Sequence, residues 1–494
     1  MTQVKTEYGV VEGVEVDDLH LFRNLPFAQA PFGVRRFRPP VRPESWDGVR
    51  DATQPGPAAP QPADGNPLSA LYLPPVTGED CLTLEVWTPD PGAVGLPVMV
   101  HIHGGGYVYG AGSVPAYSGR NFARAGIVHV GINYRVGIDG FLYLGEEAEN
   151  LGLQDQTAAL KWVQANIAAF GGDPGRVTIF GQSGGAVSVM AQLGMPASRG
   201  LFSQAIAQSG CSMAQVDAEE AMRITRKVAR KLGVAPTVEG MSGVPLDRTV
   251  AETERILQRF ALGLALRDKR SMLLSPFRGV HGTPTLPLSP YDTARAGQDD
   301  PGVRLLAGTV RNEVTDLVQA IADLPGLGRF VRRGLRSALG FDGALVDAYR
   351  NGPRGISGSS ALVEAGWTDW AFRIPTIRLL EARSGPSWLY EFRWQPANRP
   401  AGLGATHGLD VTFARDELAS LRGIEEMAYP VFGDAPPQSL ATAMHGAFVR
   451  FAVDGDPGWA QYEEDVRPTM VFDEVSEVVP DAAGVEREAW AGRR

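Results

Sequence analysis

Short apolar runs alternate with amphipathic segments along most of the chain. Runs of strand length lie at 82–87, 96–103, 127–136, 203–208, 303–308 and 388–394, and a further one begins at Val177. Residues 150–170, 217–232 and 438–454 carry apolar side chains at helical spacing. Alternating strands and helices are typical of a mainly parallel sheet covered by helices on both faces. The pattern therefore predicts an α/β fold.

Other parts of the chain break this alternation. Residues 4–16 place Gly9 and Gly13 among β-favouring residues, which predicts an N-terminal hairpin. Residues 51–78 are rich in Ala, Pro and Gly, and we expect an irregular surface segment there. Because the chain contains no internal repeat and no clear linker, we expect one domain over residues 1–494.

A serine lies at the turn between a short strand and a helix. Gly181, Ser183 and Gly185 form the pattern Gly-x-Ser-x-Gly. Such a sharp turn strains the backbone of the serine and leaves no space for side chains two positions away, which explains the glycines. The pattern fits the nucleophile elbow of α/β-hydrolases. The amide of the next residue, Gly184, is then placed to stabilise an oxyanion.

A glycine-rich loop follows the strand at 96–103. His103 precedes three glycines and Tyr107. Consecutive glycines let the backbone turn its N–H groups towards a ligand. Taken alone, the segment is also consistent with a flexible loop. Upstream of a nucleophile elbow, it is expected to form the other half of an oxyanion hole.

A serine nucleophile needs a base, and the base needs a carboxylate that orients it. In α/β-hydrolases the chain order is nucleophile, acid, base, so we expect the base late in the chain. Three histidines follow Ser183. His281 precedes every suitable acid, and His445 lies in the terminal helix among small and apolar residues. His407, in a loop flanked by glycines, is therefore the predicted base.

The acid is expected between the nucleophile and the base, after a strand. Glu313 follows the strand at 303–308 and is the predicted acid. Asp316, one helical turn later, is the alternative. Without the other two members of the set, Glu313 would be read as a solvent-facing loop residue.

Composition narrows the class of protein. Of 494 residues, 44% are hydrophobic and 21% are charged, which is ordinary for a globular protein. The formal net charge of −10 argues against a nucleic-acid partner. No apolar run approaches the roughly 18 residues of a membrane span, and the N-terminus lacks the apolar core of a secretion signal. Cys81 and Cys211 are expected to be reduced thiols in a cytoplasmic protein.

Motifs along nearly the whole chain resemble the type-B carboxylesterase family, which includes carboxylesterases, cholinesterases and bacterial para-nitrobenzyl esterases. They lie at 25–28, 36–40, 79–82, 103–107, 133–135, 150–156, 170–174, 208–210 and 467–472. The resemblance implies an α/β-hydrolase fold with a large, mainly parallel central sheet. It also implies mostly helical excursions, at about 212–300 and 316–384, that form a cap over the active-site gorge.

The resemblance assigns roles to individual residues. It implies Ser183 as nucleophile, Glu313 as acid and His407 as base. Three features depart from the family pattern. Secreted relatives pair the cysteine at the position of Cys81 with an earlier one, but here that earlier place is Ala59-Pro60-Gln61, so Cys81 is expected to have no partner. Val314 follows the acid where a glycine is usual, and Gln182 stands before the nucleophile where Glu is frequent.

Further roles follow from the same resemblance. It implies that the oxyanion is bound by the backbone N–H groups of Gly105, Gly106 and Gly184. Ser209 and Asp410 match a buried polar network behind the triad, although a plain structural role fits them nearly as well. No metal or organic cofactor is implied.

The expected function is hydrolysis of small to medium apolar carboxylic esters through an acyl-enzyme, by a monomer or weak homo-oligomer. The alternatives are a catalytically silent binding module on the same fold, or the same triad acting on carbamates, amides or lactones. We expect segments 60–78, 212–290 and 316–384 to build the acyl and alcohol pockets. Tyr107, Phe277 and Trp370 are candidate wall residues, although simple packing explains each of them as well.

Overall fold

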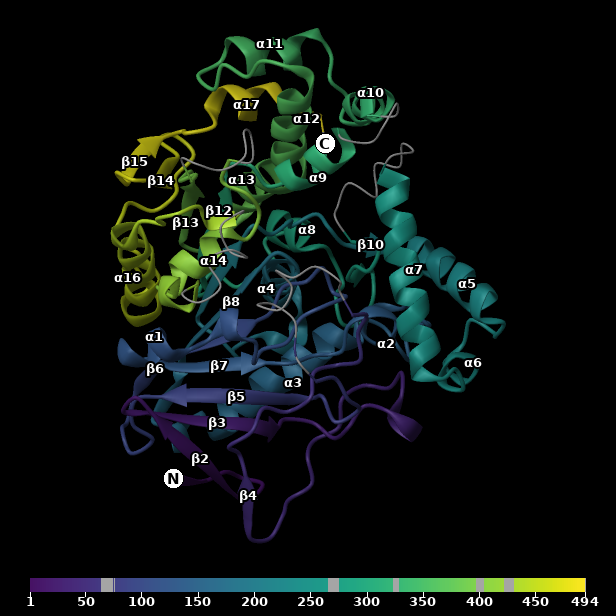
Figure 1. The fold of residues 1–494 in the computed structure, drawn as a ribbon, viewed down its shortest axis with the longest axis vertical. Coiled ribbons are helices and arrows are strands. Elements are labelled where there is room, and N and C mark those ends of the chain that lie inside the picture. Colours follow the sequence, from purple (N-terminus) through teal and green to yellow (C-terminus); the bar gives the residue numbers. More distant parts are fainter. Residues whose placement is uncertain are drawn as a thin grey trace.

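A large sheet passes through the molecule in the computed structural model (Figure 1). The structure describes residues 1–63, 74, 76–264, 275–322, 328–396, 404–421 and 431–493. Within these residues, thirteen strands form the sheet, and β4 (Val49–Asp51) pairs with β2 off the main path. Along that path the order is β1 (Thr2–Lys5), β2 (Val10–Val16), β3 (Leu19–Pro26), β5 (Thr83–Thr88), β7 (Val128–Ile132), β6 (Leu96–Ile102), β8 (Gly172–Gln182), β9 (Gln204–Gln208), β12 (Arg304–Val310), β13 (Ser387–Phe392), β14 (Pro468–Phe472) and β15 (Glu477–Pro480).

The centre of the sheet is parallel and its two ends are antiparallel. The seven strands from β7 to β14 along this path run parallel to one another. The antiparallel pairs are β1 with β2, β2 with β3, β3 with β5, β5 with β7, and β14 with β15. The mainly parallel α/β architecture and the N-terminal hairpin are thus confirmed. Since parallel strands end at one edge, the loops after β6, β8, β12 and β13 meet there.

Helices cover both faces of the sheet because its central strands are apolar on both sides. On β8, Ile179 packs into one core and Phe180 into the other. The same alternation holds on β12 for Leu305 and Leu306. One face is covered by α3 (Leu151–Asn166) and α4 (Gly184–Gly194). The opposite face is covered by α14 (Leu409–Ala414) and α16 (Gln438–Asp454).

Two groups of helices extend beyond the sheet (Figure 1). The first comprises α5 (Ala218–Leu232), α6 (Val238–Ser242) and α7 (Leu246–Leu264). The second comprises α9 (Thr315–Ala322), α10 (Gly328–Ala338), α11 (Gly343–Asn351), α12 (Ser359–Thr368) and α13 (Ile374–Ala382). A π-helical turn, Asp369–Arg373, joins α12 to α13. Both groups lie within the segments for which mostly helical excursions were expected, and residues 265–274 and 323–327 of those segments lie outside the described part of the chain.

The remaining elements are short. A two-stranded parallel sheet pairs β10 (Val216–Asp217) with β11 (Val280–His281). At the start of α5, the Asp217 carboxylate accepts a hydrogen bond from the Glu220 amide at 2.7 Å, which is a standard N-cap. The other helices are α1 (Arg120–Arg124), α2 (Gly137–Phe141), α8 (Pro290–Arg295) and α17 (Gly484–Ala489).

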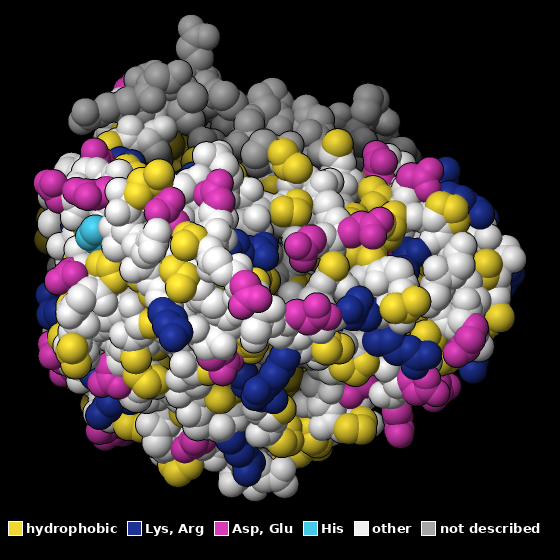
Figure 2. All heavy atoms as spheres, turned by 90° about the horizontal axis from the view of Figure 1, so that it is seen from below, with side chains coloured by type: hydrophobic (Ala, Val, Ile, Leu, Met, Phe, Trp, Pro, Cys, Tyr) yellow, Lys and Arg dark blue, Asp and Glu magenta, His cyan; other side chains and the backbone are white. Residues whose placement is uncertain are grey.

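One face of the molecule mixes charges of both signs (Figure 2). On the face seen in Figure 2, Lys and Arg side chains lie among Asp and Glu, and apolar side chains are scattered between them. Of the helices in the described residues, none is both long enough and apolar enough to cross a membrane.

Candidate active site

Ser183 lies at the tip of a strained turn between β8 and α4. Its φ of +56° and ψ of −122° are rare for a residue with a side chain. A Cβ atom added to Gly181 would lie 2.6 Å from the carbonyl oxygen of Ile102, and one on Gly185 would lie 2.1 Å from the same oxygen. Only glycine fits at both positions. The steric reason given for the Gly-x-Ser-x-Gly pattern is therefore confirmed.

The glycine-rich loop after β6 folds against this turn. Gly105 and Gly106 have φ angles of +97° and +60°, which glycine adopts without strain. A Cβ atom on Gly184 would lie 3.0 Å from the nitrogen of Gly106, so the loop and the start of α4 are in close contact. Gly105, Gly106, Gly184 and Ser183 line one cavity. Amide groups from two segments thus lie near the serine, as an oxyanion hole requires.

Glu313 and His407 are brought together from positions 94 residues apart. The Nδ1 atom of His407 lies 2.5 Å from Oε2 of Glu313. The other carboxylate oxygen of Glu313 accepts a hydrogen bond from the amide of Val310 at 3.0 Å. Glu313 is buried, whereas the side chain of His407 is 25% exposed. Of the two candidate acids, Glu313 contacts the histidine, and Asp316 instead accepts a hydrogen bond from Thr406 at 2.8 Å.

The loops that carry Glu313 and His407 are paired through their backbones. The Asn312 amide donates to the Ala405 carbonyl at 2.9 Å, and Asn312 and Thr406 form a parallel β-bridge. The Asn312 side chain in turn accepts from the Ala405 amide at 3.2 Å. Gly404 has a φ of +58°, and a Cβ atom there would lie 2.2 Å from Asn312 Oδ1. The glycine before His407 therefore allows this close approach.

The second ring nitrogen of His407 faces the nucleophile turn. The Gln182 amide nitrogen lies 3.1 Å from Nε2 of His407. With the Gln182 amide as donor, Nε2 carries the lone pair and Nδ1–H donates to Glu313, which is the tautomer that a general base needs. Burial disfavours the charged imidazole, but the hydrogen bond and negative charge of Glu313 outweigh it and raise the pKa of His407. Sequence analysis noted Gln182 only as a departure from the family pattern, because nothing in the motif shows where its amide points.

A cavity of about 330 Å³ lies in front of Ser183 and His407. The predicted wall residues Tyr107 and Phe277 line it. Trp370 does not, since its ring packs against the apolar cluster of the second helical group. Another residue of the same π-helical turn, Phe372, lines the cavity instead, and its ring lies 5.3 Å from the ring of His407. The further lining residues are Val108, Tyr109, Val187, Ser209, Cys211, Ala214, Leu257, Ser275, Arg278 and Ala371.

Ser209 and Asp410 are both fully buried, and of the two only Ser209 lines the cavity. Asp410 Oδ2 accepts hydrogen bonds from the Gln208 amide and the Tyr390 hydroxyl, each at 3.0 Å. Burial raises the pKa of Asp410 to about 6. Ser209 has a φ of +54° and lines the cavity. The polar network around Asp410 is therefore made with Gln208 and Tyr390, and the sequence carried no signal for the tyrosine.

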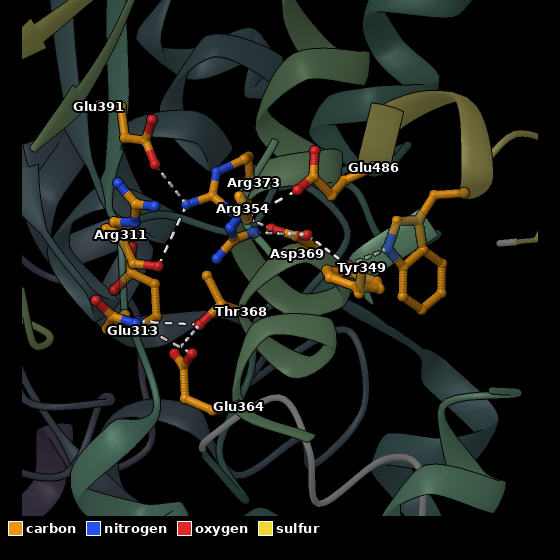
Figure 3. A network of polar contacts seen from close by, with 12 residues as sticks. Arg311, Glu313, Tyr349, Arg354, Glu364, Thr368, Asp369, Arg373, Glu391 and Glu486 are labelled. Carbon is orange, nitrogen blue, oxygen red and sulfur yellow. Dashed lines mark hydrogen bonds and ion pairs between the residues drawn. The ribbon is translucent and has the colours of Figure 1, made fainter. Parts of the chain in front are cut away.

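Glu313 also belongs to a larger polar network in the second helical group (Figure 3). Its amide donates to the Thr368 hydroxyl at 3.0 Å, and that hydroxyl donates to Glu364 at 2.8 Å. Arg373, in the π-helical turn, donates to Asp369, to Glu391 and to the carbonyl of Arg311, two residues before Glu313. Because these partners are nearly all buried, the position of the acid depends on a well-defined set of hydrogen bonds.

His281 and His445, the two late histidines that were not predicted as the base, lie away from Glu313. His281 is on β11 and does not line the cavity. His445 lies in α16, where its Nδ1 atom is 3.0 Å from the carbonyl oxygen of Ala414. The two cysteines are free thiols in the structure, Cys81 in the core and Cys211 on the cavity wall.

Comparisons with known proteins show which proteins this chain resembles. A family model described as "Carboxylesterase family" matches residues 1–474. The chain is 35% identical to the para-nitrobenzyl esterase of Bacillus subtilis, over 98% of this chain and 97% of that protein. It is 32% identical to the phenmedipham hydrolase of Pseudarthrobacter oxydans, over 97% and 96% of the two chains. Among solved structures, a PNB esterase matches with a TM-score of 0.84 and 33% identity, over 99% of both chains.

Proposed function

The chain belongs to the carboxylesterase family, and from this premise we propose that it hydrolyses esters with a triad of Ser183, His407 and Glu313 through an acyl-enzyme. The observation that carries the proposal is the 2.5 Å contact between His407 and Glu313, at the cavity that Ser183 also lines. The strained backbone of Ser183 supports a functional role, because strain of this kind is retained where it serves a mechanism.

In the proposed mechanism, His407 Nε2 takes the proton of Ser183 as Oγ attacks the ester carbonyl carbon. Glu313 holds the Nδ1–H tautomer and stabilises the imidazolium that forms. His407 then protonates the leaving alkoxide, which departs as the alcohol. Water attacks the acyl-enzyme by the reverse sequence and releases the acid. For the first step, the Gln182 amide must give way to the serine hydroxyl at Nε2.

The tetrahedral intermediate places a negative charge on the former carbonyl oxygen. We assign its stabilisation to the backbone N–H groups of Gly105, Gly106 and Gly184, which line the cavity beside the serine. Loss of one such donor typically raises the barrier by about 3 kcal/mol. The close contact between the loop and α4 keeps these groups in place before the substrate arrives.

The proposed substrates are small to medium apolar esters. The cavity volume of about 330 Å³ and its lining by Tyr107, Val108, Phe277 and Phe372 support this choice. Of the segments expected to build the pockets, 212–290 contributes Ala214, Leu257 and Phe277 and 316–384 contributes Phe372, while residues 64–73, 75 and 265–274 lie outside the described part of the chain.

The deciding experiment compares Ser183→Ala with Ser203→Ala, a serine away from the cavity. The first variant should lose hydrolysis of p-nitrophenyl butyrate and labelling by a fluorophosphonate probe, and the second should keep both. Parent-level turnover by Ser183→Ala would refute the proposal. If the parent protein took up no probe, the silent binding module would be the better explanation. A panel of esters from acetate to decanoate then measures which acyl chain length is preferred. A carbamate, an amide and a lactone in the same panel show which type of bond is hydrolysed.

A further inference from the structure

The backbone carbonyls of the glycine-rich loop, from His103 to Tyr107, each accept a hydrogen bond. The Gly106 carbonyl accepts from the Ser275 hydroxyl at 2.5 Å, across 169 positions in the sequence. The donors to the other carbonyls all lie within residues 103–137, and they are the Tyr134 hydroxyl (to His103, 2.8 Å), the His103 ring (to Gly104, 2.9 Å), the Val108 and Tyr109 amides (to Gly105, 3.0 and 3.1 Å) and the Gly137 amide (to Tyr107, 2.6 Å). Because glycine rotates freely, such bonds are what keep a loop of this kind in one shape. Of these donors, Ser275 is the one that belongs to the segment between α7 and β11.

Ser275 is held so that its proton goes to Gly106. The residue is only 7% exposed and lines the cavity. Its Oγ atom accepts a hydrogen bond from the Phe277 amide at 3.1 Å and lies 2.9 Å from the Phe277 carbonyl oxygen. A hydroxyl has one proton, and the Gly106 carbonyl, at the shorter distance of 2.5 Å, is the better acceptor. Further along, the Gly279 carbonyl accepts from the Val216 amide at 3.0 Å, which ties the same segment to β10.

The bond to Ser275 fixes the peptide unit between Gly106 and Tyr107. Gly106 has a φ of +60° and no side chain, so little else opposes rotation of this unit. In a trans peptide the C=O and N–H groups point in opposite directions, so a fixed carbonyl also fixes the amide of Tyr107. A Cβ atom on Gly184 would lie 3.0 Å from the nitrogen of Gly106 and 3.3 Å from the nitrogen of Tyr107. The part of the loop that Ser275 holds is therefore the part that lies against the start of α4.

We propose that Ser275 is a positioning residue for the oxyanion hole: its hydroxyl holds the Gly106 carbonyl, and through it the amides that would bind the oxyanion. The inference rests on the proposed function of Ser183 and adds to it a residue from the segment that follows the first helical group. Preorganised donors act where charge develops, so they stabilise the transition state more than the bound ester. Loss of the Ser275 hydroxyl should therefore lower kcat and leave KM nearly unchanged.

The kinetic test compares Ser275→Ala with Ser212→Ala, a matched control. Ser212 is also buried, and its hydroxyl donates to the backbone carbonyl of Pro375 at 2.8 Å, outside the glycine-rich loop. With p-nitrophenyl butyrate, Ser275→Ala should lower kcat about 10-fold, which is less than the loss of about 100- to 1,000-fold that removal of an oxyanion donor itself causes. KM should stay within about twofold, and Ser212→Ala should keep both constants within about twofold.

A pair of ketone inhibitors measures the oxyanion hole itself. 1,1,1-Trifluoro-2-heptanone would add to Ser183 as a hemiketal whose oxygen takes the place of the oxyanion, whereas 2-heptanone binds without forming this adduct. Ser275→Ala should raise the inhibition constant of the trifluoroketone about 10-fold and leave that of 2-heptanone within about twofold. If Ser275→Ala fails to fold, Ser275→Cys fills nearly the same space with a weak donor and should show the same changes.

Several results would overturn the inference. Unchanged kcat and unchanged trifluoroketone affinity in the Ser275 variant would mean that the hydroxyl does not hold the loop. A rise in KM alone would instead place Ser275 in contact with the bound ester, and an equal loss of kcat in Ser212→Ala would make the effect a general one. In each of these cases the parent protein still hydrolyses esters, so only the role of Ser275 is contradicted. If the parent protein hydrolyses no ester and takes up no fluorophosphonate, the proposed function itself fails, and the inference falls with it.

Discussion

Thr368 offers a sharp test of how the acid is held. Its hydroxyl accepts the hydrogen bond of the Glu313 amide and donates to Glu364, and the residue is fully buried (Figure 3). Thr368→Val keeps the shape of the side chain and removes both bonds. The Glu313 amide then has no acceptor in that position, and Glu364 loses a donor.

The expected loss follows from these two bonds. Leaving a buried backbone N–H unsatisfied costs about 1–3 kcal/mol, and the lost bond to Glu364 adds about 1 kcal/mol. The free energy of unfolding should therefore fall by about 2–4 kcal/mol, as measured by urea denaturation. We also expect kcat to fall with little change in KM, because Thr368 does not line the cavity and acts only through Glu313.

Thr368→Ser is the matched control. It keeps the hydroxyl and removes one methyl group, so it should lose only about 1 kcal/mol of stability and retain most of the parent kcat. If Thr368→Val proved as stable and as active as Thr368→Ser, the hydroxyl would not hold Glu313, and the reasoning would be wrong.

Three further predictions follow from other groups. Because only the neutral imidazole accepts the serine proton, kcat/KM should rise with pH through the raised pKa of His407, and Glu313→Gln should move this midpoint to lower pH in profiles from pH 5 to 9. Burial lowers the pKa of His101 well below its ordinary value, so its contribution to stability is present above about pH 6.5 and is lost as pH falls below that value. The free energy of unfolding, measured by urea denaturation, should therefore rise with pH between pH 5 and 7. His101→Phe should reduce the slope of this rise by up to about 1.4 kcal/mol per pH unit. Since Cys211 lines the cavity, methyl methanethiosulfonate should inhibit ester hydrolysis by the parent protein but not by Cys211→Ala; equal inhibition of both would contradict this.

The central strands could be predicted because each is apolar on both faces. Residues 96–103 stand out as a nearly continuous apolar run, and the structure has β6 there. The edge strand β15 was not predicted, since most of its side chains are exposed and its sequence has no apolar run. The turn at Ser183 was predictable for a different reason: its steric demand restricts two neighbouring positions to glycine.

Contacts of the site between residues far apart in the sequence were harder to predict. Chain order and the family resemblance selected Glu313 and His407, but no local pattern relates residues 94 positions apart in the sequence. The contact between Gln182 and His407 depends on a side-chain direction, which a motif does not encode. Trp370 was a candidate for the wall because it is aromatic. The π-helical turn instead presents the next two residues, Ala371 and Phe372, to the cavity, and no sequence pattern distinguishes this turn from a regular α-helix.

The π-helical turn at Asp369–Arg373 has a consequence for how the pocket can be altered. A π-helical turn corresponds to one residue more than the α-helix accommodates, so removal of a single residue there would restore regular winding. Each residue of an α-helix turns the chain by about 100°, so the deletion would swing Phe372 away from His407 without altering the elbow or the glycine loop. A change of chain length at this site, rather than a substitution, would therefore reshape the cavity in front of Ser183.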